Sequence, residues 1–129
     1  MPTVTAIYLA AAVALYSVLA FIIIINRYKR QISIGDNRQP DFARMVRSHG
    51  NFAEYAPITL IAIMIAELAG VPSNILHVCG IGLIIGRSLH AYSFLFTAND
   101  LKLRVAGMVL TFVSLWTATG AALSVVLAH

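Results

Sequence analysis

Five polar side chains are spaced along residues 44–55, directly before an apolar run at residues 58–66. They are Arg44, Arg47, Asn51, Glu54 and Tyr55. At about 100° per residue of an α-helix, all five fall within one arc of about 100°. Arginines bind carboxylates, a glutamate binds an ammonium group and an asparagine binds an amide. The pattern therefore predicts a site for a small zwitterionic ligand with an excess of carboxylate.

A second polar group lies in a later apolar segment, where Arg87 and His90 share a helical face. Arg87 is ten residues from Thr97, or about 15 Å along a helix, and Glu54 is thirteen residues from Asp41, or about 20 Å. Ionisable side chains at membrane depth are costly, so they face a protein interior or a wet cavity. We therefore expect Glu54 and Arg87 to form an ion pair or to share a charged ligand.

Each of these residues also has an ordinary structural explanation when it is taken alone. Arg44 and Arg47 have the position of anchors at the cytoplasmic membrane surface, and Arg104 that of an anchor at a helix end. His90 is explained equally well as a satisfied interior histidine. Their convergence on one half of a small bundle favours a functional site.

The composition indicates an integral membrane protein, because 60% of the 129 residues are hydrophobic and 11% are charged. Four apolar stretches reach the length of about 20 residues that is needed to cross a bilayer. They are Val4–Asn26, Asp41–Ala69, Ser73–Thr97 and Leu101–Leu127. Only helices satisfy the backbone of such segments in lipid. We expect an all-α, four-helix membrane bundle that forms one domain over residues 1–129, with Gly82 and Gly86 allowing another helix to approach closely.

The positions of the basic residues predict the orientation of the bundle. Lysines and arginines are concentrated in residues 27–47 and at Lys102 and Arg104, whereas the connection at residues 70–73 has none. Basic loops remain in the cytoplasm, so both termini are expected outside and the site in the cytoplasmic half. The formal charge of +4 is thus a topological marker and does not indicate nucleic-acid binding. Cys79 and the four histidines show no metal-ligand spacing.

These features resemble the MAPEG superfamily, the membrane-associated proteins in eicosanoid and glutathione metabolism. The resemblance covers nearly the whole chain. It rests on the signature at residues 44–57, on Arg87 and His90 in the third span, and on Arg104 at the start of the fourth. The short form looks most like the bacterial inner-membrane branch. The resemblance implies a homotrimer in lipid, with sites between neighbouring copies that open to the cytoplasm.

The resemblance also implies that glutathione is the cofactor and that a thiol is activated. The positions implied to bind glutathione are Arg47, Asn51, Glu54, Tyr55, Arg87 and His90. Arg104 is the implied catalytic residue, because a guanidinium stabilises the thiolate of a thiol whose pKa is otherwise about 8.5. The acceptor would be an apolar electrophile or a lipid hydroperoxide that arrives from the bilayer.

The chain departs from the family pattern at two positions. Phe94 stands where a ligand-contacting tyrosine is common, and the nearby Tyr92 points elsewhere on a regular helix. His49 takes the place of a glutamine-like contact residue. Two functions therefore stay open. We favour a glutathione transferase or peroxidase that acts on lipophilic electrophiles, and the alternative is a non-catalytic protein that binds lipids or other ligands on the same scaffold.

Overall fold

The computed structural model describes residues 1–97 and 100–128 as four long helices. They are α1 (Thr3–Arg30), α2 (Pro40–Leu68), α3 (Ser73–Phe96) and α4 (Leu101–Leu127). Each helix is long and apolar enough to cross a membrane. The predicted all-α class and the four predicted spans are confirmed. The first helix continues four residues beyond Asn26, through the basic residues that end it at Arg30.

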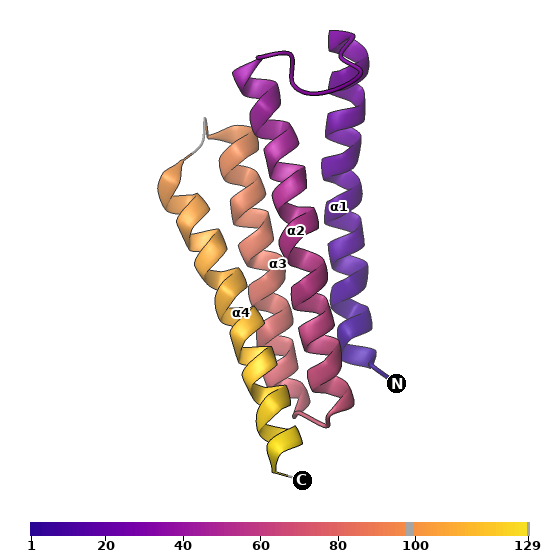
Figure 1. Cartoon of the computed structure of the whole chain (residues 1–129), viewed down its shortest axis with the longest axis vertical. Coiled ribbons are helices and arrows are strands. Elements are labelled where there is room, and N and C mark those ends of the chain that lie inside the picture. The colour runs from indigo at the N-terminus through magenta and orange to yellow at the C-terminus, as the bar shows by residue number, and fades with distance from the viewer. Residues whose placement is uncertain (98–99, 129) are drawn as a thin grey trace.

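The helices run alternately up and down, so the two ends of the molecule differ (Figure 1). Both termini lie at one end, together with the short connection between α2 and α3. The segment at residues 31–39 lies at the other end, which we call the loop end. The sequence predicted that the termini and the connection at residues 70–73 would share one end and that the first loop would lie at the other, and the structure has this arrangement.

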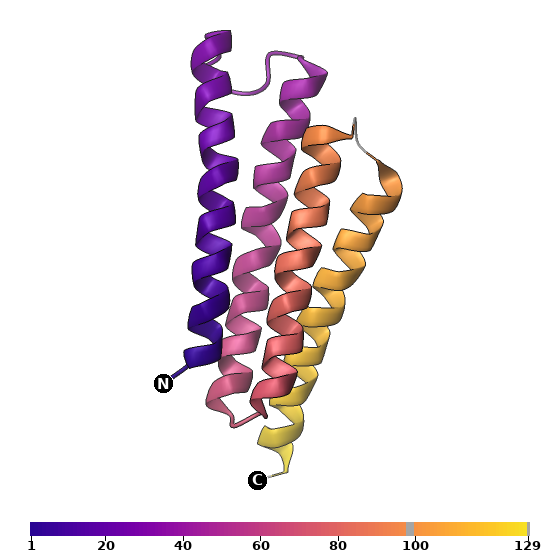
Figure 2. The ribbon, with the colours of Figure 1, turned by 180° about the vertical axis from the view of Figure 1, so that it is seen from behind.

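Helices α2 and α3 form the middle of the molecule, and α1 and α4 flank them (Figures 1 and 2). Both outer helices pack against α2 and α3. The core between them is mostly aliphatic, and Ile63, Leu76 and Leu83 are fully buried. The two central helices therefore carry the side chains that the bundle shields best.

Glycines bring α3 and α4 into backbone contact. A Cβ atom placed on Gly86 would lie 2.8 Å from the carbonyl oxygen of Gly107, and one placed on Gly107 would lie 2.6 Å from that of Gly86. Gly82, one turn away, lies against the hydroxyl of Ser114. The close approach expected for the glycine pair of the third span is confirmed, and its partner is α4.

Glu67 provides the N-terminal cap of α1 from the end of α2. Its carboxylate accepts hydrogen bonds from the backbone N–H groups of Val4 and Thr5, each at 2.8 Å, and from the Thr5 hydroxyl at 2.7 Å. The residue that precedes α1 is Pro2, which makes no side-chain cap. The first N–H groups of a helix need such acceptors. The sequence alone assigns no role to Glu67.

Changing Glu67 to alanine is expected to lower the free energy of unfolding by about 1–2 kcal/mol, the usual cost of a lost cap. Hydrogen exchange at the start of α1 should accelerate in the same variant. Ser124→Ala is the control at the same end of the molecule, because among the described residues the Ser124 hydroxyl bonds only to the Ala121 carbonyl of its own helix. Equal melting of both variants in detergent would show that Glu67 does not hold α1.

Candidate functional site

Arg87 of α3 is the centre of the polar cluster and is only 1% exposed. Its Nε donates to Oγ1 of Thr111 at 2.9 Å, and its Nη1 donates to Oδ1 of Asn51 at 2.6 Å. Nη1 also contacts the Asn51 carbonyl oxygen at 3.5 Å, while Nη2 contacts the Gly107 carbonyl oxygen at 3.4 Å and Sδ of Met108 at 3.1 Å. These five contacts equal the five N–H donors of a guanidinium. Arg87 thus ties α3 to α2 and α4.

The expected direct ion pair between Glu54 and Arg87 is wrong for this chain. Glu54 instead accepts from Arg47 of its own helix at 3.3 Å, and these two side chains are 51% and 60% exposed. Asn51 lies about 60° around the helix from Glu54. This rotation turns Asn51 toward α3 and leaves Glu54 on the outer edge of α2. Sharing of a ligand between Glu54 and Arg87 stays a prediction.

The positive charge of Arg87 is surrounded by neutral groups. Its Cζ lies 5.4 Å from the centre of the Tyr55 ring, which is a cation–π distance. Tyr55 also packs edge-on against Phe112 of α4, at 5.6 Å between ring centres. Of the predicted binding residues, Asn51, Tyr55 and Arg87 are therefore brought together at the junction of α2, α3 and α4.

His90, Phe94 and Arg104 form a stack between α3 and α4, nearer the loop end. The rings of His90 and Phe94 are 5.0 Å apart, and Cζ of Arg104 lies 5.5 Å from the Phe94 ring centre. His90 is buried. His90 and Arg104 thus both contact the ring of Phe94, at the position where the resemblance implies a tyrosine.

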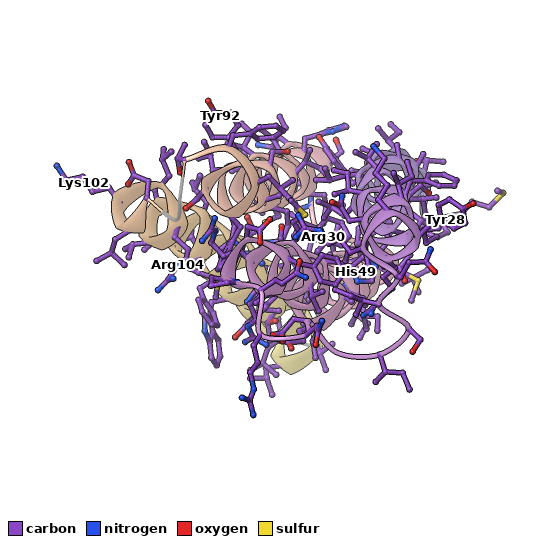
Figure 3. All side chains as sticks on the ribbon, turned by 90° about the horizontal axis from the view of Figure 1, so that it is seen from above. Tyr28, Arg30, His49, Tyr92, Lys102 and Arg104 are labelled. Carbon is purple, nitrogen blue, oxygen red and sulfur yellow. The ribbon has the colours of Figure 1, made fainter. Side chains whose placement is uncertain are left out.

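Two other positions point away from this cluster. Tyr92 is 51% exposed, stacks on Phe96 and projects outward from the bundle (Figure 3). His49 turns toward α1, where its ring lies 4.8 Å from the ring of Tyr16. The expectation that Tyr92 points elsewhere than Phe94 is confirmed. His49 takes no part in the contacts around Arg87.

The sequence analysis missed three residues of α4 that hold Arg87. They are Gly107, Met108 and Thr111. Gly107 and Thr111 are four residues apart, so they share one face of the helix. The sequence did contain a signal for them, because a glycine and a threonine share one face of an apolar span. A buried arginine such as Arg87 needs acceptors, and this face could have been predicted to supply them.

The carboxylates of the chain are all engaged away from Arg87. Asp41 pairs with Arg30 and Glu54 pairs with Arg47. Asp36 accepts from the backbone N–H of Arg38, Glu67 caps α1 and Asp100 caps α4. These are the five acidic residues of the sequence. A buried arginine without a carboxylate makes the neighbourhood attractive to an anion.

A bundle of four membrane-spanning helices with a cationic cluster toward one end defines an integral membrane protein with a candidate anion site. The model of the MAPEG family matches residues 5–124 of this sequence. The chain therefore belongs to the MAPEG family.

Two curated relatives support this assignment. The chain is 31% identical over 91 residues to inner membrane protein YecN of Escherichia coli strain K12, and the match covers 70% of each protein. It is equally similar to inner membrane protein YecN of Escherichia coli O6:H1 strain CFT073.

Proposed function

We propose that this protein binds glutathione at the loop end and activates its thiol for attack on lipophilic electrophiles or lipid hydroperoxides. The observation that carries the proposal is the charge of Arg87, which is buried and is neutralised by no carboxylate of the chain. Glutathione carries two carboxylates and one ammonium group, so a net cationic site suits it. Membership of the MAPEG family agrees with this ligand.

The candidate residues lie on three helices, and we propose that each helix has a different part in binding the ligand. Arg47, Asn51, Glu54 and Tyr55 on α2 are proposed to hold the peptide, with Glu54 facing the ammonium group. Because the donors of Arg87 are directed at protein acceptors, its proposed contribution is to hold Asn51 in place and to supply positive charge. His90 follows Arg87 by one turn of α3 and packs on Phe94, the ring that Arg104 also contacts. Arg104 is proposed to stabilise the thiolate, which then attacks an electrophilic carbon to form a thioether. The attack either displaces a leaving group as an anion or adds to an activated double bond, whose other carbon takes up a proton.

We propose a homotrimer, because one chain leaves polar groups uncovered at membrane depth. The Arg47–Glu54 ion pair is half-exposed on the same edge of α2 as Ile58 and Ile61. An ion pair facing lipid would be expensive, and a neighbouring copy would shield it. The small residues at positions 6, 10 and 14 of α1 are also exposed, and the one at position 17 is half-buried; this stripe suits close packing between copies.

We propose an inner-membrane location with the loop end in the cytoplasm and both termini outside. The named relatives are inner membrane proteins. The basic residues near the loop end agree with this orientation. A cytoplasmic site has access to the reduced thiol pool, and the lipophilic acceptor would arrive from the bilayer.

Phe94 favours the second candidate function, a non-catalytic ligand-binding protein on the same scaffold. Its ring packs against both His90 and Arg104 and brings no hydroxyl group. Tyr92 cannot replace that hydroxyl, since it projects from the outer face of α3 (Figure 3). The two candidate functions differ in thiol activation: the enzyme lowers the pKa of the bound glutathione thiol, and the non-catalytic protein does not.

The test is an absorbance titration of the bound thiolate with detergent-solubilised protein between roughly pH 6 and 9, around the thiol pKa of about 8.5. Wild type should show a glutathione-dependent thiolate signal at pH values well below the pKa of the free thiol. Arg104→Ala should bind glutathione but lose the signal at neutral pH, because the positive charge that lowers the thiol pKa is gone. Activity toward a lipophilic electrophile should fall in parallel.

Lys102→Ala is the matched control, because Lys102 projects away from the bundle near the start of α4 (Figure 3). It should retain the wild-type signal. Equal signals from wild type and Arg104→Ala would reduce Arg104 to a helix-end anchor. Binding without any thiolate signal in wild type would favour the non-catalytic candidate.

A further inference from the structure

The segment between α1 and α2, residues 31–39, folds back along the end of α1. Nη1 of Arg27 in α1 donates to the carbonyl oxygen of Ser33 at 3.4 Å and to that of Gly35 at 3.0 Å. Ile32 is buried, so a side chain of the segment also fastens it to the bundle. Figure 1 shows that the segment lies below the end of α1 and not beyond it. The middle of the segment is therefore held level with the last turns of α1.

The outer face of α1 indicates where the membrane surface lies. Exposed apolar side chains follow one another along this face at helical spacing. They are Phe21, Ile24, Ile25 and Tyr28. Tyr28 projects outward from the bundle (Figure 3), and the exposed Lys29 directly follows it. Because tyrosines and basic residues are enriched where hydrocarbon meets the headgroups, Tyr28 is the position on α1 where the hydrocarbon ends. The segment that Arg27 holds therefore lies at the level of the headgroups.

Ile34 is presented to the surroundings from the middle of a fixed backbone. It is 88% exposed, although Arg27 holds the carbonyl groups of the residues on either side of it. Gln31 and Arg38 have left-handed backbone conformations, with φ of 55° and 56°. Residues other than glycine keep such conformations only where the surrounding contacts impose them. At the level of the headgroups, burial of the Ile34 side chain against acyl chains is favourable.

The basic side chains around this segment outnumber the carboxylates. The last turn of α1, the segment and the first turn of α2 contain four basic and two acidic residues, which leaves a net charge of +2. Asp41 pairs with Arg30. Asp36 accepts from the backbone N–H of Arg38 at 2.9 Å. Lys29 and Arg38 are exposed, and their side chains make no ion pair with another described residue. Both cations are therefore available to an anionic surface.

We propose that residues 28–38 form a docking surface for the headgroups of anionic phospholipids. Ile34 enters the boundary between headgroups and acyl chains at the level of Tyr28, and Lys29 and Arg38 contact the lipid phosphates. An acidic soluble protein would complement the two cations equally well. The apolar side chains at this level favour the lipid, because they continue the lipid-facing stripe of α1. Binding of glutathione is not needed for this surface to act.

The test compares fluorescent phosphatidylglycerol with fluorescent phosphatidylcholine, each binding to the full chain in a neutral detergent, by fluorescence anisotropy. Wild type should bind the anionic lipid about tenfold or more tightly at low salt, because each basic residue near an anionic surface contributes about fivefold. Lys29→Gln and Arg38→Gln should each reduce this preference about fivefold. The preference should also shrink at about 1 M salt, where the Debye length is about 3 Å. Ile34→Ser should weaken the binding of both lipids and keep their ratio.

Lys102→Gln is the matched control, because it removes one exposed positive charge at the same end of the molecule, near the start of α4 (Figure 3). It should keep the wild-type preference, and an effect as large as that of Arg38→Gln would overturn the proposal in favour of a general effect of charge. Equal binding of the two lipids by wild type would overturn it without any variant. Displacement of the lipid by dilute glycerol 1-phosphate would show a site for free phosphate and overturn the lipid surface. Unchanged lipid binding in Ile34→Ser would also overturn it, and a protein partner would then suit the two cations better.

Discussion

Asn51→Ala is expected to lower the free energy of unfolding by about 2–3 kcal/mol, even without any ligand. The reason is that Arg87 loses its shortest hydrogen bond, at 2.6 Å, in a position where it is 1% exposed. A buried charged donor that loses its partner is among the costly defects of a protein interior. The unfolding midpoint in detergent, measured in the absence of glutathione, checks this result.

Asn26→Ala is the matched control for the loss of an asparagine amide. Within the part of the chain that the structure describes, the side chain of Asn26 bonds only within α1, to Ile22 and Arg30. Its removal should change the midpoint little. If both variants melted like wild type, the hydrogen bond between Asn51 and Arg87 would not contribute to the stability of the bundle. Binding of glutathione should also weaken in Asn51→Ala, because Asn51 is a proposed ligand contact.

Gly107→Ala is expected to have the second large effect, because it forces α3 and α4 apart. The added Cβ would lie 2.6 Å from the Gly86 carbonyl oxygen and 2.9 Å from the backbone nitrogen of His90. Backbone atoms cannot rotate away as a side chain can, so the helices must shift. Overpacking of this kind costs about 1–3 kcal/mol. The shift would also lengthen the contacts of Arg87 with Gly107 and Thr111.

Gly120→Ala is the control on the same helix, because no atom lies within 4 Å of a Cβ at that position. An alanine in an open helical position is expected to be neutral or to stabilise by up to about 1 kcal/mol. Melting in detergent should therefore move in opposite directions, or at least differ clearly, between the two variants. Equal melting would mean that the contact between Gly86 and Gly107 is not close in the folded protein.

The sequence by itself determined the architecture of this protein. Apolar stretches of about 20 residues require helices in a membrane, and turn residues separate them, so the four helices follow from composition and length. The helical period also placed Asn51 and Tyr55 on one face with the arginines of α2. These features depend on local chemistry and on the bilayer, so no knowledge of packing is needed to predict them.

The partners of the polar groups were decided only by the tertiary structure. An arc of about 100° on α2 contains both Glu54 and Asn51, and packing selected the amide, not the carboxylate, to meet Arg87. The acceptors on α4 and the cap that Glu67 places on α1 join residues far apart in the chain.

Such contacts depend on how each helix is rotated about its own axis. That rotation is set by the fit of small residues such as Gly86 and Gly107. A rotation of about 60° exchanges one hydrogen-bond partner for another while leaving the hydrophobic pattern of the spans unchanged. The pattern of apolar residues is therefore enough to predict the membrane spans of this protein. The hydrogen-bond partners of the buried Arg87 are decided only when the helices pack.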